Sequence, residues 1–476
     1  MDTTGYTPEE PIAAVATALA PAALGIIRVS GKNSIQLLSK IFSRPKALNE
    51  AAGNTIVYGW IVEPTDNAAR IDEVLVSVFR APKSFTGEEM AEISCHGGTA
   101  VVTKIFNALL KNGFRQAERG EFTFRAFING KTDLTKAEAV REIIDSRTSA
   151  SSQKAAGRLA GNLSTKIIEI QKSLVDTLAQ IEVEIEYPED EETIADSYDQ
   201  SRLLEAISQL ETLASTWKSE KLYQEGARVV LCGKTNSGKS SLFNSLLKEE
   251  RAIVSDIEGT TRDWIESWIS LDGIPARLFD TAGLRNTSDE IEARGVESAK
   301  ELSDEADLLF YLADITLPKD QIDLAFLSER KEPVIFVWNK IDKTVADQNT
   351  AASAKNQAQK FLDANKEKVP SLAAQVFVSA KDGSGVKDLV AAAKSVLLKG
   401  EGTERGQAGL GSERQKRLVE QALESLRHAA SLQKGYSLDA AVQDIEDALD
   451  FLGELIGKVT ADDVLESVFS HFCVGK

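Results

Sequence analysis

A glycine loop that follows an apolar run constrains this chain more than any other stretch. Residues 229–232 read VVLC, and the loop GKTNSGKS follows at 233–240. This is the pattern of a P-loop, in which backbone N–H groups surround a phosphate chain, the lysine contacts the β- and γ-phosphates, and the next hydroxyl binds Mg²⁺. A chance glycine turn could look similar, but an apolar run precedes the loop and a helical pattern follows at 241–247. Nucleotide binding is therefore predicted.

The bulk composition limits the class of protein. A chain of 476 residues with 42% apolar residues can bury two or three cores. The formal charge of −18 disfavours strong binding of nucleic acid by this chain alone. The three cysteines have no metal-ligand or disulfide spacing, no apolar run is long enough to span a membrane, and the first residues lack a signal-peptide pattern. We expect a cytoplasmic protein with no membrane segment.

Periodicity divides the chain into segments. Short β-like runs, among them 25–29 and 73–79, are mixed with one or two helices up to about residue 128, which favours an α+β domain. A helical pattern covers about 134–186, and a second helix is expected near 201–220. Strands and helices then alternate from about 227 to 398, as in a parallel sheet with helices on both faces.

A glycine-rich linker at 400–411 leads into a helical tail at 412–476. Helical segments before and after the sheet segment suggest that the two pack together around an insertion. The predicted domains are 1–128, 129–222, 223–399 and 400–476. The predicted fold class is multidomain: an α+β N-terminal domain, a discontinuous all-α helical domain, and an inserted α/β domain that carries the P-loop.

Four further motifs follow the P-loop in the order that a GTPase requires. They are GTTRD at 259–263, DTAG at 280–283, NKID at 339–342 and SAK at 379–381. A threonine of the first motif can bind Mg²⁺, and the second supplies an aspartate and a glycine N–H near the γ-phosphate. The carboxylate of Asp342 can accept both N1–H and the exocyclic amine of guanine, a pair of donors that adenine does not present. GTP is therefore the predicted nucleotide, and the inserted domain is predicted to be an α/β Ras-like P-loop GTPase domain.

The position that orients the attacking water in Ras-like proteins is unusual here. Leu284 follows the DTAG glycine, and its side chain cannot hydrogen-bond water. Three acidic residues downstream could replace it, namely Asp289, Glu290 and Glu292. No arginine finger is evident, although Arg262 and Arg285 lie in these segments.

Over nearly its full length the sequence resembles the tRNA-modification GTPase MnmE (TrmE) family. The likeness includes GIIRVSG at 25–31, SFTGEE at 84–89, HGG at 96–98, GEF at 120–122, RAFINGK at 125–131 and the ending FCVGK at 472–476. Residues 18–24, ALAPAAL, depart from it, since the family is usually rich in glycine and arginine there. So does the pair at 118–119, which replaces Arg-Pro.

The resemblance implies roles for individual residues of the GTP site. Lys239 and Thr261 would act in catalysis, and Glu292 would orient the hydrolytic water. Ser240 and Thr261 would hold Mg²⁺, whereas Asn236, Ser255, Ile257 and Thr260 would surround K⁺. The full candidate GTP site comprises Asn236, Ser237, Gly238, Lys239, Ser240, Ser241, Ser255, Asp256, Ile257, Glu258, Gly259, Thr260, Thr261, Asp280, Thr281, Ala282, Gly283, Asn339, Lys340, Asp342, Ser379, Ala380 and Lys381.

The resemblance also implies a second site and partners. Arg28, Glu92, Lys131 and Lys476 would bind a 5-formyl- or methylene-tetrahydrofolate, with Cys473 beside them as a candidate catalytic thiol. The implied reaction is modification of C5 of the wobble uridine in certain tRNAs. An FAD-containing MnmG-like partner would supply the redox chemistry, because this chain has no G-x-G-x-x-G fingerprint. A homodimer is expected, with tRNA bound through the complex.

An alternative interpretation is a GTPase that has no modification chemistry. A regulatory or ribosome-assembly GTPase would carry the same nucleotide motifs, but it would have no use for a folate pocket. His96 is interpreted as a hydrogen-bonded structural histidine, because no second metal ligand is spaced nearby.

Overall fold

The computed structural model describes residues 10–63, 69–186, 200–249, 265–280, 304–317, 322–344, 348–399, 408–432, 438–458 and 462–476. Contacts between residues divide the chain into two compact units. The first comprises Met1–Arg141, Ser164–Ala206 and Leu418–Lys476, and the second comprises Glu142–Leu163 and Ile207–Arg417. The division falls within helices, so each unit contains segments that are far apart in the sequence.

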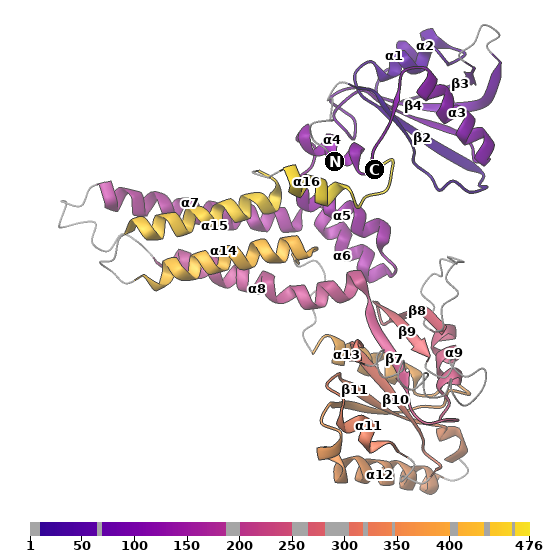
Figure 1. Ribbon diagram of the computed structural model, residues 1–476, viewed down its shortest axis with the longest axis vertical. Coiled ribbons are helices and arrows are strands. Elements are labelled where there is room, and N and C mark those ends of the chain that lie inside the picture. The colour runs from indigo at the N-terminus through magenta and orange to yellow at the C-terminus, as the bar shows by residue number, and fades with distance from the viewer. Residues whose placement is uncertain are drawn as a thin grey trace. The chain divides into compact units, whose positions relative to one another are not determined.

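The first unit is built on a six-stranded sheet with the order β3-β4-β5-β2-β1-β6 (Figure 1). Its neighbouring strands are antiparallel except for β1 and β6, which are parallel. The strands are β1 (Ile12–Val15), β2 (Leu24–Ser30), β3 (Thr55–Val62), β4 (Arg70–Phe79), β5 (Met90–His96) and β6 (Arg115–Gln116).

One face of this sheet is buried under helices. Val74, Val76 and Val78 of β4 pack in a core with side chains of α1 (Ser34–Ser39), α2 (Pro45–Asn49) and α3 (Thr99–Lys111). The alternate residues of the strands point the other way, as the two-residue period of a strand requires. The predicted α+β character of this segment is confirmed.

The helical pattern predicted for 134–186 is resolved into three helices. They are α5 (Leu134–Asp145), α6 (Ser149–Leu159) and α7 (Asn162–Glu186). The first break occurs where Thr148 accepts a hydrogen bond from the Ser151 backbone N–H as an N-cap. The second occurs at Gly161, whose φ of 99° interrupts the helical backbone. The helical period of apolar residues in the sequence continues across both breaks, because each break spans only a few residues.

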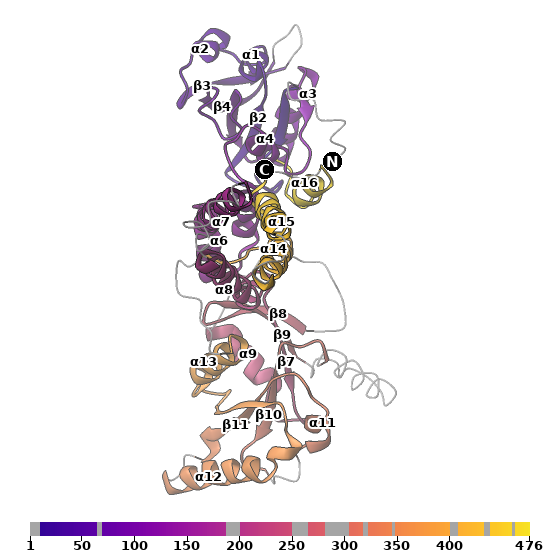
Figure 2. The same ribbon diagram turned by 90° about the vertical axis from the view of Figure 1, so that its left-hand side faces the viewer.

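The remaining helices of the helical segments are α4 (Glu121–Ile128), α8 (Gln200–Glu225), α14 (Glu413–Ser431), α15 (Leu438–Ile456) and α16 (Asp462–Phe469). Helix α7 lies beside α15 (Figures 1 and 2). Between the two helices, Gln171 Nε2 donates to the Leu449 carbonyl at 3.4 Å. Gln200 of α8 likewise donates to the Ala430 carbonyl of α14 at 3.1 Å. The helices before and after the predicted insertion therefore do pack together.

The second unit contains another six-stranded sheet, with the order β12-β11-β10-β7-β9-β8. Its strands are β7 (Ala227–Cys232), β8 (Ile265–Leu271), β9 (Ile274–Asp280), β10 (Leu308–Asp314), β11 (Val334–Asn339) and β12 (Leu372–Phe377). All neighbours are parallel except β8 and β9. These two are antiparallel because a two-residue turn at Asp272 and Gly273, both with positive φ, reverses the chain.

Helices cover both faces of this sheet, as predicted. Leu308, Phe310 and Leu312 of β10 pack with α9 (Lys239–Glu249) and α13 (Val386–Leu397). The alternate residues of β10 pack with α11 (Leu324–Ser328) and α12 (Gln348–Ala364) on the opposite face. Two short 3₁₀ turns, Ile341–Thr344 and Lys366–Lys368, complete the unit. Among the described residues, no helix is long and apolar enough to cross a membrane.

Candidate functional site

The parallel strands of the second unit end along one edge of the sheet, and the predicted motif residues follow them there. In the strand register Leu231 lies opposite Asp280, and Asp314 lies opposite Asn339. The P-loop follows β7, and Ser379 comes two residues after β12. Ligands of open α/β sheets bind at such an edge.

Two glycines of the P-loop allow close approach of other chain segments. A Cβ at Gly233, whose φ is +128°, would lie 2.3 Å from the Leu312 carbonyl oxygen. A Cβ at Gly238, whose φ is +101°, would lie 2.1 Å from the Asn339 side-chain nitrogen. Both positions exclude any larger residue. The loop is thus packed directly against the ends of β10 and β11.

Lys239 lies under the arch of the P-loop. Its Nζ donates to the Gly233 carbonyl at 2.8 Å and to the Lys234 carbonyl at 3.1 Å, and only 7% of the residue is exposed. The hydroxyl-bearing Ser240 follows it at the start of α9 and is exposed. The loop therefore presents a cation and a helix N-terminus to the same space, which suits a phosphate chain.

Asn339 joins three of the predicted motifs. Its Nδ2 donates to the Ser237 carbonyl at 2.8 Å, and its Oδ1 accepts from the backbone N–H groups of Lys340 and Ala380 at 2.8 and 3.0 Å. The residue is 1% exposed, and these bonds engage both the oxygen and the nitrogen of its amide. The P-loop and the NKID and SAK segments are consequently fixed relative to one another by one side chain.

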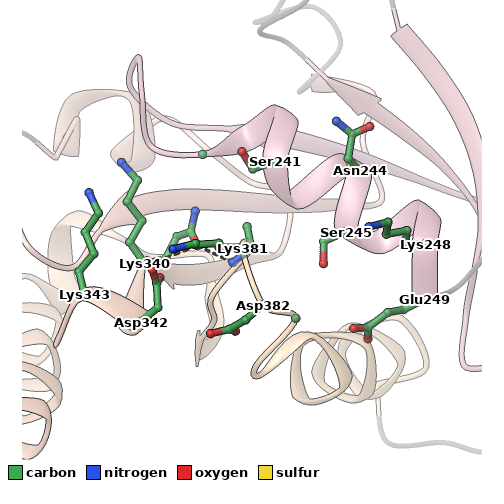
Figure 3. A pocket seen from close by; sticks show the side chains of 14 residues that line it. Ser241, Asn244, Ser245, Lys248, Glu249, Lys340, Asp342, Lys343, Lys381 and Asp382 are labelled. Carbon is green, nitrogen blue, oxygen red and sulfur yellow. Dashed lines mark hydrogen bonds between the residues drawn. The ribbon is translucent and has the colours of Figure 1, made fainter. Parts of the chain in front are cut away.

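A pocket of about 500 Å³ opens beside these motifs (Figure 3). Asp342 lines it, and the Ser379 hydroxyl donates to Asp342 Oδ1 at 3.0 Å. Helix α9 forms one side in Figure 3, and the loops after β11 and β12 form the other. The lining residues are Gly238, Ser241, Asn244, Ser245, Lys248, Glu249, Asn339, Lys340, Asp342, Lys343, Ala380, Lys381, Asp382 and Gly383.

The pocket has the chemistry that a guanine nucleotide needs. An oriented carboxylate can take the paired donors of the base, and four lysines of the lining offer positive charge. The structure thus brings together the predicted P-loop, NKID and SAK residues. The remaining predicted residues lie outside the described part of the chain: Ser255, Asp256, Ile257, Glu258, Gly259, Thr260, Thr261, Thr281, Ala282, Gly283 and Glu292, together with Arg262, Leu284, Arg285, Asp289 and Glu290.

A second cluster forms around Arg28 in the first unit. Arg28 Nε pairs with Glu92 Oε1 at 2.9 Å, across the antiparallel register of β2 and β5. The guanidinium also lies over the rings of Phe85 and Phe122, at 5.3 and 5.7 Å from their centroids. These contacts fix the charge of Arg28 in a partly buried place.

The last residues of the chain complete this cluster. Arg28 Nη1 donates to the Gly475 carbonyl at 3.2 Å, and the Phe122 backbone N–H donates to the Lys476 carbonyl at 3.2 Å. An isolated β-bridge pairs Arg119 with Val474. Gly475 is buried with a φ of +93°. Two predicted residues, Arg28 and Glu92, are therefore adjacent to the end of the chain.

Lys131, another predicted folate-binding residue, contacts the main chain of a neighbouring loop. Its Nζ donates to the Pro82 carbonyl at 3.0 Å, at the start of the loop that carries Phe85. Buried Arg125 holds the same loop through Glu88 at 3.1 Å. Lys131 and Arg125 therefore both contact the loop that carries Phe85.

Two family models match this chain. A family model described as the MnmE helical domain matches residues 134–473, and one described as the GTP-binding protein TrmE N-terminus matches residues 11–131. The tRNA modification GTPase MnmE of Treponema denticola is 51% identical over 482 residues, which cover 99% of each chain.

The chain belongs to the MnmE family. Its members in Treponema pallidum and Carboxydothermus hydrogenoformans are 41% and 39% identical over 494 and 473 residues. These alignments cover 99% and 98% of this chain, and 99% and 100% of the relatives. Among solved structures, translation elongation factor SelB of Methanococcus maripaludis with a GTP analogue is 20% identical, with a TM-score of 0.28, and covers 37% of this chain and 35% of that chain.

Several residues of the two sites were not predicted from the MnmE-like motifs. Phe85, Phe122 and Gly475 belong to quoted motifs, but no spacing indicates that they converge on Arg28. Lys248 and Glu249 stand at the far end of α9, beyond the P-loop pattern. The helical period alone could have placed them on the same side as Ser241.

His96 makes the kind of hydrogen bond that was predicted for a structural histidine. The three cysteines are free; Cys95 and Cys232 are buried and Cys473 is exposed. His96 Nδ1 hydrogen-bonds Asp72 Oδ1 at 2.8 Å, and the His96 backbone N–H donates to Asp72 Oδ2. Among the described residues, no group of three His, Cys, Asp or Glu side chains could hold a metal ion.

Proposed function

We propose that this chain is a K⁺-dependent GTP hydrolase that, with an FAD-containing MnmG-like partner, modifies C5 of the wobble uridine in certain tRNAs. Its family membership supports the coarser statement, a GTPase that acts in tRNA modification. The observation that carries the finer proposal is the contact of Arg28 with both Glu92 and Gly475 in a chain that also holds a guanine-type pocket. A nucleotide switch alone would need only the pocket.

The placement of Asp342 and Lys239 supports the binding and hydrolysis of GTP. Asp342, oriented by Ser379, would accept the two donors of guanine, and Lys239 would contact the β- and γ-phosphates. Ser240 would bind Mg²⁺ with Thr261, a site made of hydroxyl and phosphate oxygens that needs no cluster of carboxylates. Glu292 would orient the attacking water in place of Leu284.

Asn236 fits a K⁺ site by its chemistry and position. It is exposed on the P-loop with a φ of 62°, and its backbone carbonyl already accepts from Lys340 Nζ at 2.7 Å. Its amide oxygen can therefore serve as a neutral ligand together with Ser255, Ile257 and Thr260. A cation at this place would stabilise charge that develops between the β- and γ-phosphates. Otherwise Arg262 or Arg285 must supply the charge.

The Arg28 cluster suits a reduced folate. Among the described contacts Glu92 Oε2 has no partner, so it can accept from the amino and ring N–H groups of a pterin. Arg28, Lys131 and Lys476 can pair with carboxylates of the glutamate tail or position the ring. Bound 5-formyl- or methylene-tetrahydrofolate would supply the one-carbon unit, and Cys473 is a candidate thiol beside it.

A homodimer is proposed from the uncovered face of the first sheet. Ile56, Tyr58 and Leu75 on β3 and β4 are 66%, 48% and 47% exposed, and Tyr58 lies opposite Leu75 in the register. Apolar side chains gathered on one sheet face favour an interface. With a charge of −18, the chain would reach tRNA in the cytoplasm chiefly through its partner.

Analysis of the nucleosides of tRNA tests the proposal. A strain that lacks this protein should lose the modified wobble uridine, and the wild-type chain should restore it. Lys239→Ala and Arg28→Gln should each fail to restore it, because one removes the phosphate contact and the other removes the centre of the folate cluster. Exposed Lys40→Gln, in the same unit as Arg28, should restore it fully.

The same strains and variants distinguish the proposed function from the alternative one. A regulatory or ribosome-assembly GTPase would leave wobble uridines unchanged in the deletion strain, and Arg28→Gln would have no effect on tRNA. Unchanged nucleosides would overturn the modification chemistry while leaving GTP binding to be measured separately.

A further inference from the structure

Asp314 is an acidic residue beside the pocket that belongs to none of the nucleotide motifs. It is the last residue of β10, where the parallel register sets it opposite Asn339 of β11. Its side chain is only 4% exposed. A buried carboxylate is costly unless it is paired, so its contacts indicate its role.

Both oxygens of Asp314 are engaged. Oδ1 accepts from the Thr316 backbone N–H at 3.0 Å and from the Thr316 hydroxyl at 2.7 Å. Oδ2 pairs with Lys340 Nζ at 2.8 Å. Burial raises the pKa of Asp314, but the hydrogen bonds from Lys340 and Thr316 outweigh it and leave the pKa below its ordinary value. The group is therefore a fixed anion near neutral pH.

The ammonium of Lys340 connects Asp314 to the P-loop. The same Nζ donates to the Asn236 carbonyl at 2.7 Å. One cation thus joins the end of β10, the turn after β11 and the loop after β7, which are neighbouring strands of the sheet. Lys340 itself has a φ of 65° and Asn236 a φ of 62°. Both are backbone conformations that residues other than glycine seldom adopt, and they persist only where surrounding contacts hold them.

We infer that Asp314 is a positioning residue for the nucleotide site: it holds the Lys340 ammonium against the Asn236 carbonyl and so keeps the P-loop in the shape that retains a guanine nucleotide. Asp314 lines no part of the pocket and acts only through Lys340. Without the carboxylate, the ammonium would turn to water, and the carbonyl of Asn236 would lose its partner. The loop would then open more readily and release nucleotide faster.

The inference deepens the proposed function and rests on it, but it can be tested without turnover. The experiment is a chase of fluorescently labelled GDP from the full-length chain, with the dissociation rate as the readout. Asp314→Asn keeps the shape and an acceptor for Thr316 but removes the carboxylate charge that pairs with Lys340. Loss of a charge-assisted hydrogen bond should raise the rate of GDP dissociation about tenfold.

Asp307→Asn is the matched control. Asp307 is exposed near the opposite end of β10, where its carboxylate accepts from the Arg228 backbone N–H at 2.8 Å. Its GDP dissociation should stay within about twofold of the wild type, as for an ordinary surface change. Thr316→Val is a milder second variant, because it removes one hydrogen bond to Asp314 and keeps the ion pair.

A double-mutant cycle distinguishes positioning from a general structural role. In a Lys340→Met background, Asp314→Asn should change GDP dissociation by no more than about twofold, since the group it positions is gone. The K⁺ concentration for half-maximal turnover should rise in Asp314→Asn, because Asn236 is displaced. Equal GDP dissociation in Asp314→Asn and wild type, with only a lower melting temperature, would overturn the inference. Failure of the wild-type chain to bind GDP would instead refute the proposed function.

Discussion

Arg158 and Glu220 form an ion pair of 2.7 Å in the second unit, although their side chains are only 3% and 2% exposed. Glu142 and Lys154 join the pair at 2.5 Å each. A Cβ at Gly411 would lie 2.3 Å from Glu142 Oε1, so the chain before α14 approaches the cluster at a glycine. The buried charges that α5, α6 and α8 contribute therefore pair with one another.

Replacing Arg158 by Met should lower the free energy of unfolding of this unit by about 3–5 kcal/mol, because Glu142 and Glu220 would stay buried without their main partner. Urea unfolding followed by tryptophan fluorescence measures the loss. Lys221→Met removes an exposed ion pair with Glu225 and should cost no more than about 1 kcal/mol. Similar losses in the two variants would contradict the role assigned to the buried cluster.

Ending the chain after Val474 should weaken binding of 5-formyl-tetrahydrofolate roughly tenfold, because the acceptors of Arg28 and of the Phe122 N–H are lost. Calorimetry measures the affinity. Lys40→Gln is the matched control, since Lys40 is exposed in the same unit and lies outside the cluster. Unweakened binding by the shortened chain would show that these residues do not shape the site.

Substitution of Asn236 should separate the effect of K⁺ from nucleotide binding. Asn236→Gly tolerates the positive φ and removes the amide oxygen, so GTP turnover in K⁺ should fall by about tenfold or more toward its level in Na⁺. Asn236→Asp keeps an oxygen at the site and should retain a response to K⁺. Turnover is compared in the two salts at equal ionic strength. Equal wild-type rates in K⁺ and Na⁺ would remove the cation from the mechanism.

His96 should titrate above the ordinary pKa of histidine. The hydrogen bond from His96 to Asp72 raises its pKa, and the charge of Asp72 adds to the effect. The stabilisation is thus full below the ordinary histidine pKa and is lost as pH rises through the higher folded-state pKa. NMR titration can measure it, and with three histidines in the chain each signal can be assigned by substitution. Asp72→Asn should return the pKa toward its ordinary value; an unchanged titration would contradict the assignment.

Local patterns predicted much of the second unit. The P-loop, the strands that carry Asp280, Asp314 and Asn339, and the pocket around Asp342 all follow from apolar runs that end in polar motifs. The direction of the edge strand β8 is set by the two-residue turn at 272–273, which makes β8 antiparallel to β9. The alternation of strands and helices alone would have favoured a parallel strand. The predicted domain boundaries remain predictions.

Contacts between distant residues were beyond such patterns. Arg28 and Gly475 are separated by 447 positions, and only the family resemblance suggested that they share a site. The hydrogen bond from Lys131 to the Pro82 carbonyl depends on where a loop lies in space, which no local pattern gives. The folate-binding role of Lys131 stays a prediction. Asp314 belongs to no sequence motif. Its inferred role depends on the strand register and on its ion pair with Lys340, which are visible only in the structure.

The contact between Arg28 and Gly475 also has a consequence for biosynthesis. Translation adds roughly 5–20 residues per second, so about 20–90 s pass between the synthesis of Arg28 and that of Gly475. During that interval the sheet of the first unit can form while the main-chain acceptors at 475 and 476 do not yet exist. A ribosome that stops early would release a chain with an intact nucleotide pocket and an incomplete Arg28 cluster. On the proposed function, we expect such a product to bind GTP and to fail in tRNA modification, because the acceptors of Arg28 and of the Phe122 N–H are missing.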